Sequence, residues 1–315
     1  MSSLKKVAIT TGDVDGIGLE VSVKALNHWG PQAQTQFYLF RSTKAPLFQL
    51  RKFSRIQVDS IEQALSIRPM KSQLIEVVRQ DSPALWVESV AQSCLRDQFQ
   101  SLVTAPLSKQ EIKRAGLSDL GHTDILKRVS NQKHAFMTFM GPQFNVLLIS
   151  GHVPIDKIQP SLHADLIQEA ISRAHQARDM LSGSLRTKPL GVLGLNPHSG
   201  DQGLIGQFEE DLLKPLLEKL RKQMPLEGPL VPDAAFLKEN WKRFSFFIAQ
   251  YHDQGLIPFK MIHGFDSGAH LTLGLPIRRS SVDHGTAKDI FGKSRARAGS
   301  MIEALRWGVR LAHKG

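Results

Sequence analysis

Three histidines occupy similar places in the sequence, because each follows a short apolar run and precedes turn-forming residues. They are His152, His198 and His252. Three neutral imidazoles can hold a divalent metal ion and still leave coordination positions open for a substrate, as in catalytic metal sites. Their spacing matches no local zinc-binding signature, and a single histidine is more often a surface or hydrogen-bonded residue than a ligand. The residues alone therefore leave both interpretations open.

Other polar side chains suit an anionic ligand. Lys260, Arg278 and Arg279 could supply fixed positive charge to a phosphate, arginine through a bidentate fork and lysine as a point charge. A solvated basic face is the alternative. The segment 121–124 (GHTD) offers a glycine turn with hydrogen-bonding side chains, and it could equally cap the helix that follows.

Two further turns contain glycine. Residues 10–18 (TTGDVDGIG) lie between a predicted strand and a predicted helix, where backbone N–H groups could hold an anion, but they match neither a P-loop nor GxGxxG. Asp13 and Asp15 would oppose a phosphate, which favours a polar substrate or a structural role there. Residues 283–287 (DHGTA), taken alone, indicate a loop with a helix cap.

Short apolar runs alternate with longer amphipathic segments. The runs predict buried strands at residues 7–9, 37–40, 102–103, 146–149, 190–195 and 246–249. Helical periodicity is clearest at residues 161–181, 207–220 and 300–312. The alternation predicts an α/β protein with mainly parallel sheets covered on both faces, and a chain of 315 residues favours two lobes that share a cleft. Ligands bind at the carboxyl ends of such strands, which is where the candidate residues stand.

Composition narrows the classes of partner and compartment. The formal charge is +11, but the basic residues are dispersed and no RNA-binding signature accompanies them, so nucleic acid is not the favoured partner. The single cysteine, Cys94, excludes an intramolecular disulfide and fits a cytoplasmic protein. No run of eighteen apolar residues occurs, and the apolar run after residues 1–6 is too short for a signal peptide.

Taken together, the segments resemble the 4-hydroxythreonine-4-phosphate dehydrogenase (PdxA) family, from about Val7 to the last helix. The matching motifs are Thr11-Gly12-Asp13 with Gly16-Ile17-Gly18, Thr104-Ala105-Pro106-Leu107-Ser108-Lys109, Gly121-His122-Thr123, His152-Val153-Pro154, Asn196-Pro197-His198-Ser199-Gly200, Tyr251-His252-Asp253-Gln254-Gly255-Leu256, Lys260, Thr272-Leu273-Gly274-Leu275-Pro276 and Ser281-Val282-Asp283-His284-Gly285-Thr286-Ala287. The resemblance implies a metal-dependent oxidation, with decarboxylation, of 4-phosphohydroxy-L-threonine in vitamin B6 synthesis.

The resemblance also implies roles for individual residues. The metal ligands fall on His152, His198 and His252, for one Zn, Mg, Mn or Co ion. The substrate contacts fall on His122, Thr123, Lys260 and Arg279, and the candidate general bases are His122 and Lys109. By analogy with isocitrate and isopropylmalate dehydrogenases, His284, Gly285, Thr286 and Ala287 would border the NAD or NADP site.

The fold implied by the resemblance has two α/β/α lobes with an inter-lobe cleft, as in isocitrate and isopropylmalate dehydrogenases. One lobe would comprise residues 1–130 and 285–315, and the other residues 131–284, with the metal ligands and the dimer contacts. A homodimer with its active site at the interface is expected.

The sequence departs from the family pattern at two places. In the opening turn the family usually has Pro, Ala and a later Pro where this chain has Val14, Asp15 and Leu19. His270 stands where the family usually places a substrate-contacting asparagine. These departures keep two alternatives open: a paralogue that oxidises threonate or erythronate 4-phosphate, and a catalytically silent binding relative.

Overall fold

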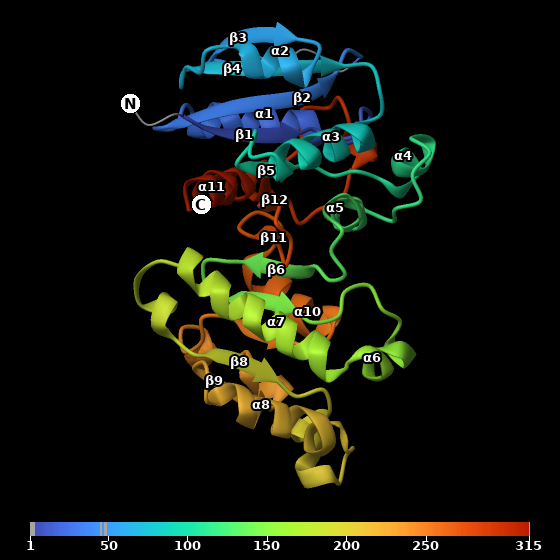
Figure 1. Ribbon diagram of the computed structural model, residues 1–315, viewed down its shortest axis with the longest axis vertical. Helices are drawn as coiled ribbons and strands as arrows, with labels where there is room; N and C mark the ends of the chain where they lie inside the picture. The colour runs from blue at the N-terminus through green and yellow to red at the C-terminus, as the bar shows by residue number, and fades with distance from the viewer. Residues whose placement is uncertain (1–3, 45, 47–48, 315) are drawn as a thin grey trace. The chain divides into compact units, whose positions relative to one another are not determined.

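The computed structural model describes residues 4–44, 46 and 49–314, which form two compact units (Figure 1). Unit 1 comprises Met1–Ala135 and Phe265–Gly315, and unit 2 comprises Phe136–Gly264. The chain therefore returns to unit 1 at residue 265, earlier than the expected boundary at 284/285. The physical reason is strand pairing: β12 (Arg279–Ser281) pairs in parallel with β5 (Ser101–Thr104), which ties this segment to the sheet of unit 1.

The sheet of unit 1 has the strand order β3-β4-β2-β1-β5-β12-β11. The remaining strands are β1 (Lys5–Thr10), β2 (Thr35–Ser42), β3 (Ser54–Val58), β4 (Gln73–Arg79) and β11 (Ala269–Leu273). All of these pairs are parallel except β11 with β12. The helices are α1 (Gly18–Trp29), α2 (Ile61–Ser66), α3 (Pro83–Leu95), α4 (Lys109–Arg114), α5 (His122–Ser130) and α11 (Gly299–His313), with the 3-10 turn η6 (Lys288–Ile290).

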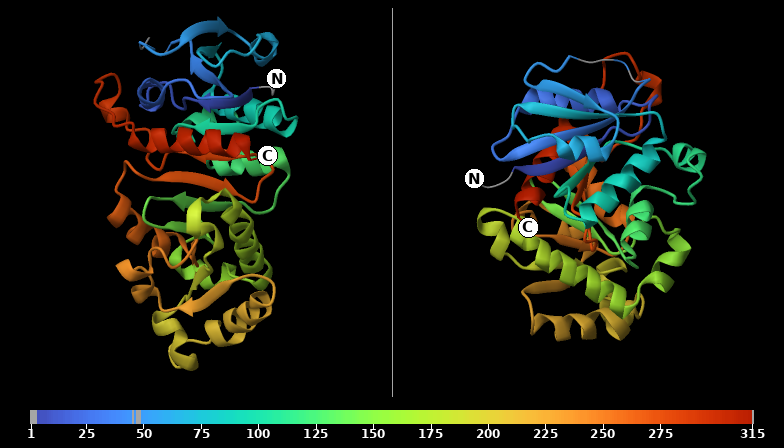
Figure 2. Two further views of the ribbon diagram at one scale, coloured as in Figure 1. Left: turned by 90° about the vertical axis from the view of Figure 1, so that its left-hand side faces the viewer. Right: turned by 45° about the horizontal axis from the view of Figure 1, so that its top comes forward.

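Helices cover both faces of this sheet, as Figure 2 shows. Successive residues of a strand point to opposite faces. On β1, Val7 and Ile9 pack with α1 and α11, whereas Ala8 packs on the other face with α3 and α5. Unit 1 therefore has the expected three-layer arrangement.

The strands of unit 2 follow the order β6-β7-β10-β8-β9. Its strands are β6 (Phe136–Met140), β7 (Asn145–Leu148), β8 (Leu190–Leu193), β9 (Leu226–Leu230) and β10 (Phe247–Ala249), all parallel except β6 with β7. The helices are α6 (Ile155–Ser161), α7 (Ala164–Ala177), α8 (Lys214–Arg221), α9 (Pro232–Ala235) and α10 (His252–His263). Shorter turns are η1 (Arg178–Met180), η2 (Gly183–Thr187), η3 (Pro197–Gly203), the π-helical η4 (Glu209–Leu213) and η5 (Lys238–Asn240).

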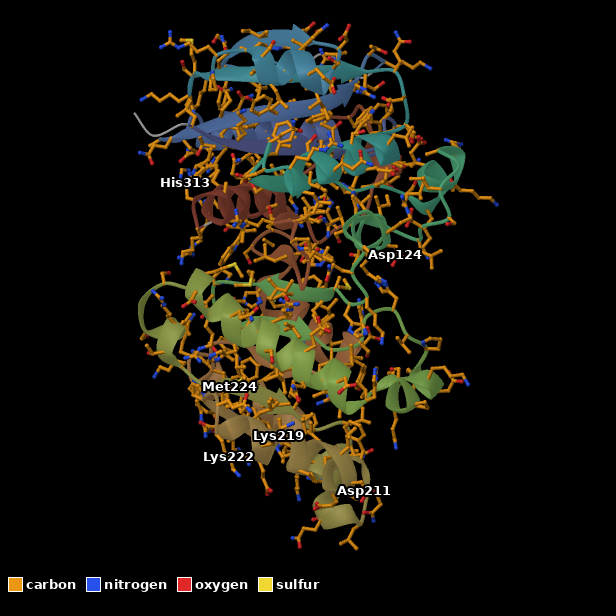
Figure 3. The ribbon with its side chains drawn as sticks, viewed as in Figure 1. Asp124, Asp211, Lys219, Lys222, Met224 and His313 are labelled. Carbon is orange, nitrogen blue, oxygen red and sulfur yellow. The ribbon has the colours of Figure 1, made fainter. Side chains whose placement is uncertain are left out.

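The predicted strands all coincide with observed ones, and the predicted helices correspond to α7, to η4 with α8, and to α11. Helix α7 is shorter than the predicted 161–181, because a 3-10 turn replaces the α-helix after residue 177. Two basic side chains, Lys219 and Lys222, are exposed at the end of α8 in unit 2 (Figure 3).

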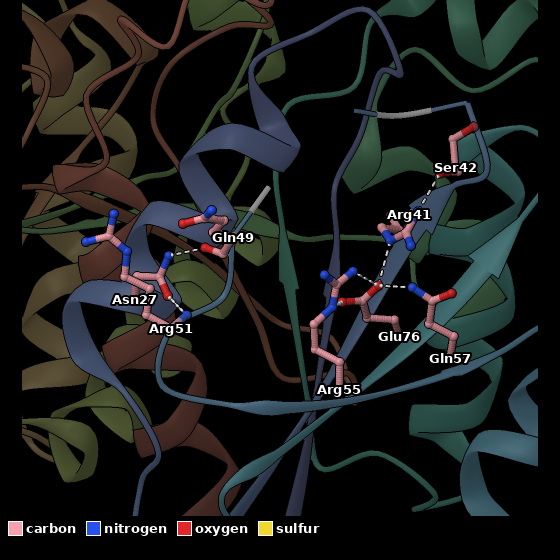
Figure 4. Close-up of polar contacts among 8 residues, drawn as sticks. All are labelled: Asn27, Arg41, Ser42, Gln49, Arg51, Arg55, Gln57 and Glu76. Carbon is pink, nitrogen blue, oxygen red and sulfur yellow. Dashed lines mark hydrogen bonds and ion pairs between the residues drawn. The ribbon is translucent and has the colours of Figure 1, made fainter. Parts of the chain in front are cut away.

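A buried charge cluster lies in unit 1, where Glu76 of β4 is 1% exposed. It accepts hydrogen bonds from Arg41 Nε at 2.8 Å and from Arg55 Nε at 2.5 Å and Nη2 at 2.9 Å (Figure 4). Burial by itself would raise the pKa of Glu76, but the hydrogen bonds and charges of Arg55 and Arg41 hold it below its usual value. The carboxylate therefore stays ionised and offsets two guanidinium groups, of which Arg41 is itself buried.

Replacing Glu76 with alanine should lower the free energy of unfolding by about 3–5 kcal/mol, because it leaves a buried arginine without its counter-ion. Urea unfolding followed by circular dichroism measures this loss. The folded-state pKa of Glu76 is lowered, so its contribution is present at neutral pH and is lost as pH falls below about 4.5. Glu218→Ala, at an exposed position, is the control and should change stability by less than about 0.5 kcal/mol. An equal, small effect of both substitutions would contradict the role of Glu76.

Candidate functional site

Two of the three predicted metal ligands lie together in unit 2. His152 follows β7, and His252 is the first residue of α10, directly after β10. Because β7 and β10 are parallel neighbours, their carboxyl ends lie side by side, and the ring centroids of the two histidines are 5.2 Å apart. Nδ1 of His252 lies 2.6 Å from Oδ1 of Asp253. A carboxylate at one ring nitrogen orients an imidazole so that the other nitrogen can bind a metal.

The third predicted ligand, His198, follows β8, which pairs in parallel with β10. Its side chain is exposed, and it begins a segment, residues 198–202, in which every φ lies between 42° and 81°. Among the residues that the structure describes, no group of three or more His, Cys, Asp or Glu side chains is arranged to hold a metal ion. His152 and His252 thus form a pair whose chemistry fits a divalent cation, and the three-histidine set stays a prediction.

Unit 1 contains a buried cation, Arg279, the first residue of β12, which is 3% exposed. Its Nη2 and Nε donate to Thr104 Oγ1 at 2.8 and 3.1 Å, and its Nη1 donates to Thr272 Oγ1 at 2.8 Å. No carboxylate of residues 4–44, 46 or 49–314 forms an ion pair with it, and burial lowers its pKa to about 9. A desolvated guanidinium whose hydrogen-bond partners are neutral is suited to bind an anion.

His122, the first residue of α5, lies in the electrostatic field of this cation. Burial, and then the charge of Arg279, lower the pKa of His122 well below its usual value, so the ring is neutral at pH 7. Its Nε2 is buried and has no hydrogen-bond partner among the described residues. A neutral imidazole in this state can accept a proton or a hydrogen bond from a ligand. Thr123 follows it and is half-buried.

The other predicted substrate residues are divided between the units. His270 of β11 is 8% exposed, and it points to the same face of that strand as Thr272, whose hydroxyl contacts Arg279. Lys109, the first residue of α4, is exposed in unit 1. Lys260 is half-buried on α10 of unit 2, the helix that begins with His252. Their roles in binding or proton transfer stay predictions.

The opening turn makes structural contacts, which is one of the two roles that the sequence left open for Asp13 and Asp15. Asp13 is 3% exposed, and its Oδ1 accepts a hydrogen bond from Ser108 N at 2.8 Å. Lys288 Nζ forms ion pairs with Asp13 Oδ2 at 2.9 Å and with Asp15 Oδ1 at 2.8 Å. The hydrogen bond from Lys288 lowers the pKa of Asp15. The two aspartates therefore join the opening turn to the segment at 288, and this pairing explains why Asp15 is tolerated there.

The predicted cofactor segment borders a cavity in unit 1. The cavity has a volume of about 370 Å³ and includes His284, Gly285 and Ala287 in its lining. Thr286 is not in the lining, but its carbonyl accepts a hydrogen bond from Ile17 N at 3.0 Å, which fixes the segment against the opening turn. Apolar side chains of Ile17, Phe265 and Ile290 complete much of the wall, together with charged Asp266 and Arg297.

A larger cavity of about 660 Å³, lined by Thr43, Gln57, Val58, Asp59, Gln63, Val78, Arg79, Gln80 and Asp81, contains none of the predicted site residues. It is wide open to solvent, and its one arginine, Arg79, is paired with Asp81. By volume, this cavity would be the better candidate for a ligand site. The smaller cavity is the better candidate by its chemistry, because residues of the predicted cofactor segment line it.

Comparison with known proteins identifies similar sequences over nearly the whole length. The family described as "Pyridoxal phosphate biosynthetic protein PdxA" matches residues 34–308. A 4-hydroxythreonine-4-phosphate dehydrogenase from a Sulfurihydrogenibium species is 33% identical over 322 residues, which cover 97% of this chain and 98% of the relative. A D-threonate 4-phosphate dehydrogenase from Cupriavidus necator is also 33% identical, and the match covers 98% of both chains.

Solved structures show the same fold. A putative 4-hydroxythreonine-4-phosphate dehydrogenase from Salmonella typhimurium superposes with a TM-score of 0.79 at 27% identity, covering 98% of this chain and 99% of that one. Isocitrate dehydrogenase from Methylococcus capsulatus superposes with a TM-score of 0.51 at 13% identity, covering 98% and 86%. The second likeness concerns the fold alone, and it confirms the expected isocitrate-dehydrogenase-like α/β class. Within the described residues, no helix has the length and apolar character needed to cross a membrane.

Proposed function

Because the chain belongs to the family of pyridoxal phosphate biosynthetic proteins PdxA, we propose that it oxidises a small 4-phosphorylated hydroxy acid with NAD or NADP and a divalent metal ion in the cytoplasm. The first candidate substrate is 4-phosphohydroxy-L-threonine, in pyridoxal phosphate synthesis. The observation that carries the proposal is Arg279, a buried cation with neutral partners whose charge acts on a neutral histidine. A phosphorylated substrate would supply the missing negative charge.

Each predicted residue has a chemical role in this reaction. His152, His198 and His252 would hold the divalent ion, which, when bound, polarises the substrate hydroxyl and stabilises negative charge on oxygen. His122 can accept the hydroxyl proton because its ring is neutral at pH 7, and Lys109 is the alternative base. Arg279, Lys260 and Thr123 would bind and orient the phosphate, with His270 nearby on β11. Residues 284–287 would border the nicotinamide nucleotide.

D-threonate 4-phosphate is the second candidate substrate, with erythronate 4-phosphate as a close variant. The D-threonate 4-phosphate dehydrogenase from Cupriavidus necator is as similar to this chain as the Sulfurihydrogenibium enzyme, at 33% identity. His270, in place of the usual asparagine, lies on the same strand face as a residue that contacts Arg279. A ring in place of an amide changes both the space and the hydrogen bonds offered to a substrate's polar groups.

The test is an assay of NADH or NADPH absorbance with the purified protein and each substrate. We expect turnover that ceases after treatment with a chelator and returns when a divalent metal is added. A higher kcat/KM for D-threonate 4-phosphate than for 4-phosphohydroxy-L-threonine would favour the second candidate. Binding of NAD with no turnover of any of these substrates, at any added metal, would identify a silent relative and overturn the proposal.

We also propose a homodimer in which α10 contributes to the interface. This helix carries His252 at its first residue, and it exposes Ile257, Met261 and Ile262 to 60%, 78% and 42%. Apolar side chains gathered on one helix are typical of a surface that a partner covers. A second copy would bury these side chains, which lie on the same helix as the proposed metal ligand His252. The active site would then lie at the interface.

Replacing Met261 with aspartate is expected to convert the dimer into monomers, because burying a carboxylate in an apolar interface is unfavourable. Size-exclusion chromatography with light scattering measures the mass. Leu237→Asp places the same charge at another exposed apolar position of unit 2, outside α10, and should leave the dimer intact. A wild-type protein of monomer mass would refute the proposed assembly without affecting the proposed chemistry of each site residue.

A further inference from the structure

The backbone that carries His198 has an unusual conformation. His198, Ser199, Asp201 and Gln202 all have φ between 42° and 55°, and Gly200 between them has φ of 81°. A left-handed conformation costs an ordinary L-residue roughly 1–2 kcal/mol, so consecutive residues rarely adopt it. Such a segment persists only when its surroundings hold it in place.

Glu209, in the π-helical turn η4, contacts the residues that precede this left-handed segment in the chain. Its side chain is 0% exposed. Oε1 accepts hydrogen bonds from the backbone nitrogens of Leu195 at 2.7 Å and Asn196 at 2.8 Å, and Oε2 accepts one from Asn196 Nδ2 at 2.8 Å. Three donors thus satisfy one buried carboxylate. All three belong to Leu195 and Asn196, which lie between the end of β8 and the left-handed segment.

The turn also closes tightly around this carboxylate. A Cβ atom added to Gly200 would lie 2.8 Å from Glu209 Oε2, which is closer than real Cβ atoms approach an oxygen. Gly206 has φ of 136°, and a Cβ there would lie 2.8 Å from Asn196 Nδ2. Gly200 and Gly206 therefore both approach the Glu209–Asn196 pair so closely that neither position has space for a side chain. Glu209 is the acceptor around which the segment is organised.

We propose that Glu209 is a positioning residue for metal binding, which acts through Asn196 to fix the left-handed turn that presents His198. This inference rests on the proposed function, in which His198 is a metal ligand. A loop that had to be ordered during binding would give up part of the affinity as conformational entropy. Glu209 prevents this by holding the backbone of residues 195 and 196 before any ion arrives, so its loss should weaken metal binding in a protein that is still folded.

The test exchanges the donor and acceptor groups of the pair. Glu209→Gln places an amide NH₂ opposite the NH₂ of Asn196, while its oxygen can still accept from the two backbone N–H groups. Asn196→Asp alone places two carboxylates face to face. In the double variant Glu209→Gln/Asn196→Asp, the glutamine amide donates to the aspartate, so the hydrogen bond is restored with reversed polarity. Asp211→Asn is the matched control, since Asp211 lies exposed on the same turn η4 (Figure 3).

Co²⁺ binding to the metal-free proteins is measured by competition with a chromophoric chelator, and circular dichroism establishes that each variant is folded. We expect each single substitution at 209 or 196 to weaken Co²⁺ binding by roughly 10- to 100-fold, the effect typical of residues that orient metal ligands. The double variant should recover most of this loss, and Asp211→Asn should bind as the wild type does. Wild-type affinity in both single variants, or no recovery in a folded double variant, would overturn the inference.

Wild-type protein and His198→Ala distinguish this failure from failure of the proposed metal site. If the wild type binds no Co²⁺, or if His198→Ala binds it equally well, then His198 is not a ligand, and the inference about Glu209 is overturned with it. If His198→Ala loses binding while the Glu209 and Asn196 variants retain it, the metal site stands and only the positioning role is wrong.

Discussion

The His252→Ala protein is expected to lose both its bound divalent metal and its dehydrogenase activity. His252 begins α10 beside His152, and its Nδ1 lies 2.6 Å from Oδ1 of Asp253. This contact orients the ring so that its other nitrogen can bind a metal ion. Metal ions contribute several kcal/mol of charge stabilisation in reactions of this type, so kcat/KM should fall on the order of 10³-fold. Metal content after dialysis and NADH absorbance give the two measurements.

Two further variants serve as comparisons for His252→Ala. Asp253→Asn keeps the imidazole of His252 but weakens the hydrogen bond that orients it. Its loss of metal affinity should therefore be smaller than that of His252→Ala, roughly 10- to 100-fold. His163→Ala removes an exposed histidine of the same unit at the start of α7 and should change neither metal content nor rate. Full activity and unchanged metal content in His252→Ala would eliminate this residue from the ligand set.

Replacing Arg279 with methionine is expected to abolish tight binding of the phosphorylated substrate. A buried charged contact that loses one partner costs about 2–5 kcal/mol, which corresponds to a rise in KM or Kd of roughly 30- to 5,000-fold. Arg278→Met is the matched control, because the two arginines are adjacent and only Arg279 donates to Thr104 and Thr272. Equal effects of the two substitutions would show that a diffuse positive field, rather than the Arg279 site, binds the phosphate.

The same variant should be at least as stable as the wild type in the absence of substrate. Burial lowers the pKa of Arg279 to about 9, so the folded protein bears the cost of holding this cation away from water. Methionine removes that cost, and the thermal midpoint should therefore stay constant or rise. This outcome is opposite to that of Glu76→Ala, in which a satisfied charge cluster is broken. A large fall in the midpoint would identify Arg279 as a structural residue.

The sequence was sufficient to predict the strands β1, β2, β5, β7, β8 and β10 and three helical segments, because their signals are local. Residues 7–9 form a central strand, and residues 300–312 fall within α11, where apolar side chains recur at helical spacing. It also placed His152, His198 and His252 after strands, as observed. The return to unit 1 was placed too late because pairing of β12 with β5, across many intervening residues, is not a local property.

The tertiary structure alone decided which charged groups are buried and what they contact. Arg278 and Arg279 are equivalent in the sequence, yet only Arg279 is buried, with Thr104 and Thr272 as partners from two other strands. The ion pairs of Lys288 with Asp13 and Asp15 likewise join segments from opposite ends of the chain. Periodicity is set by near neighbours in the chain, whereas burial, charge and pKa depend on residues that only folding brings together.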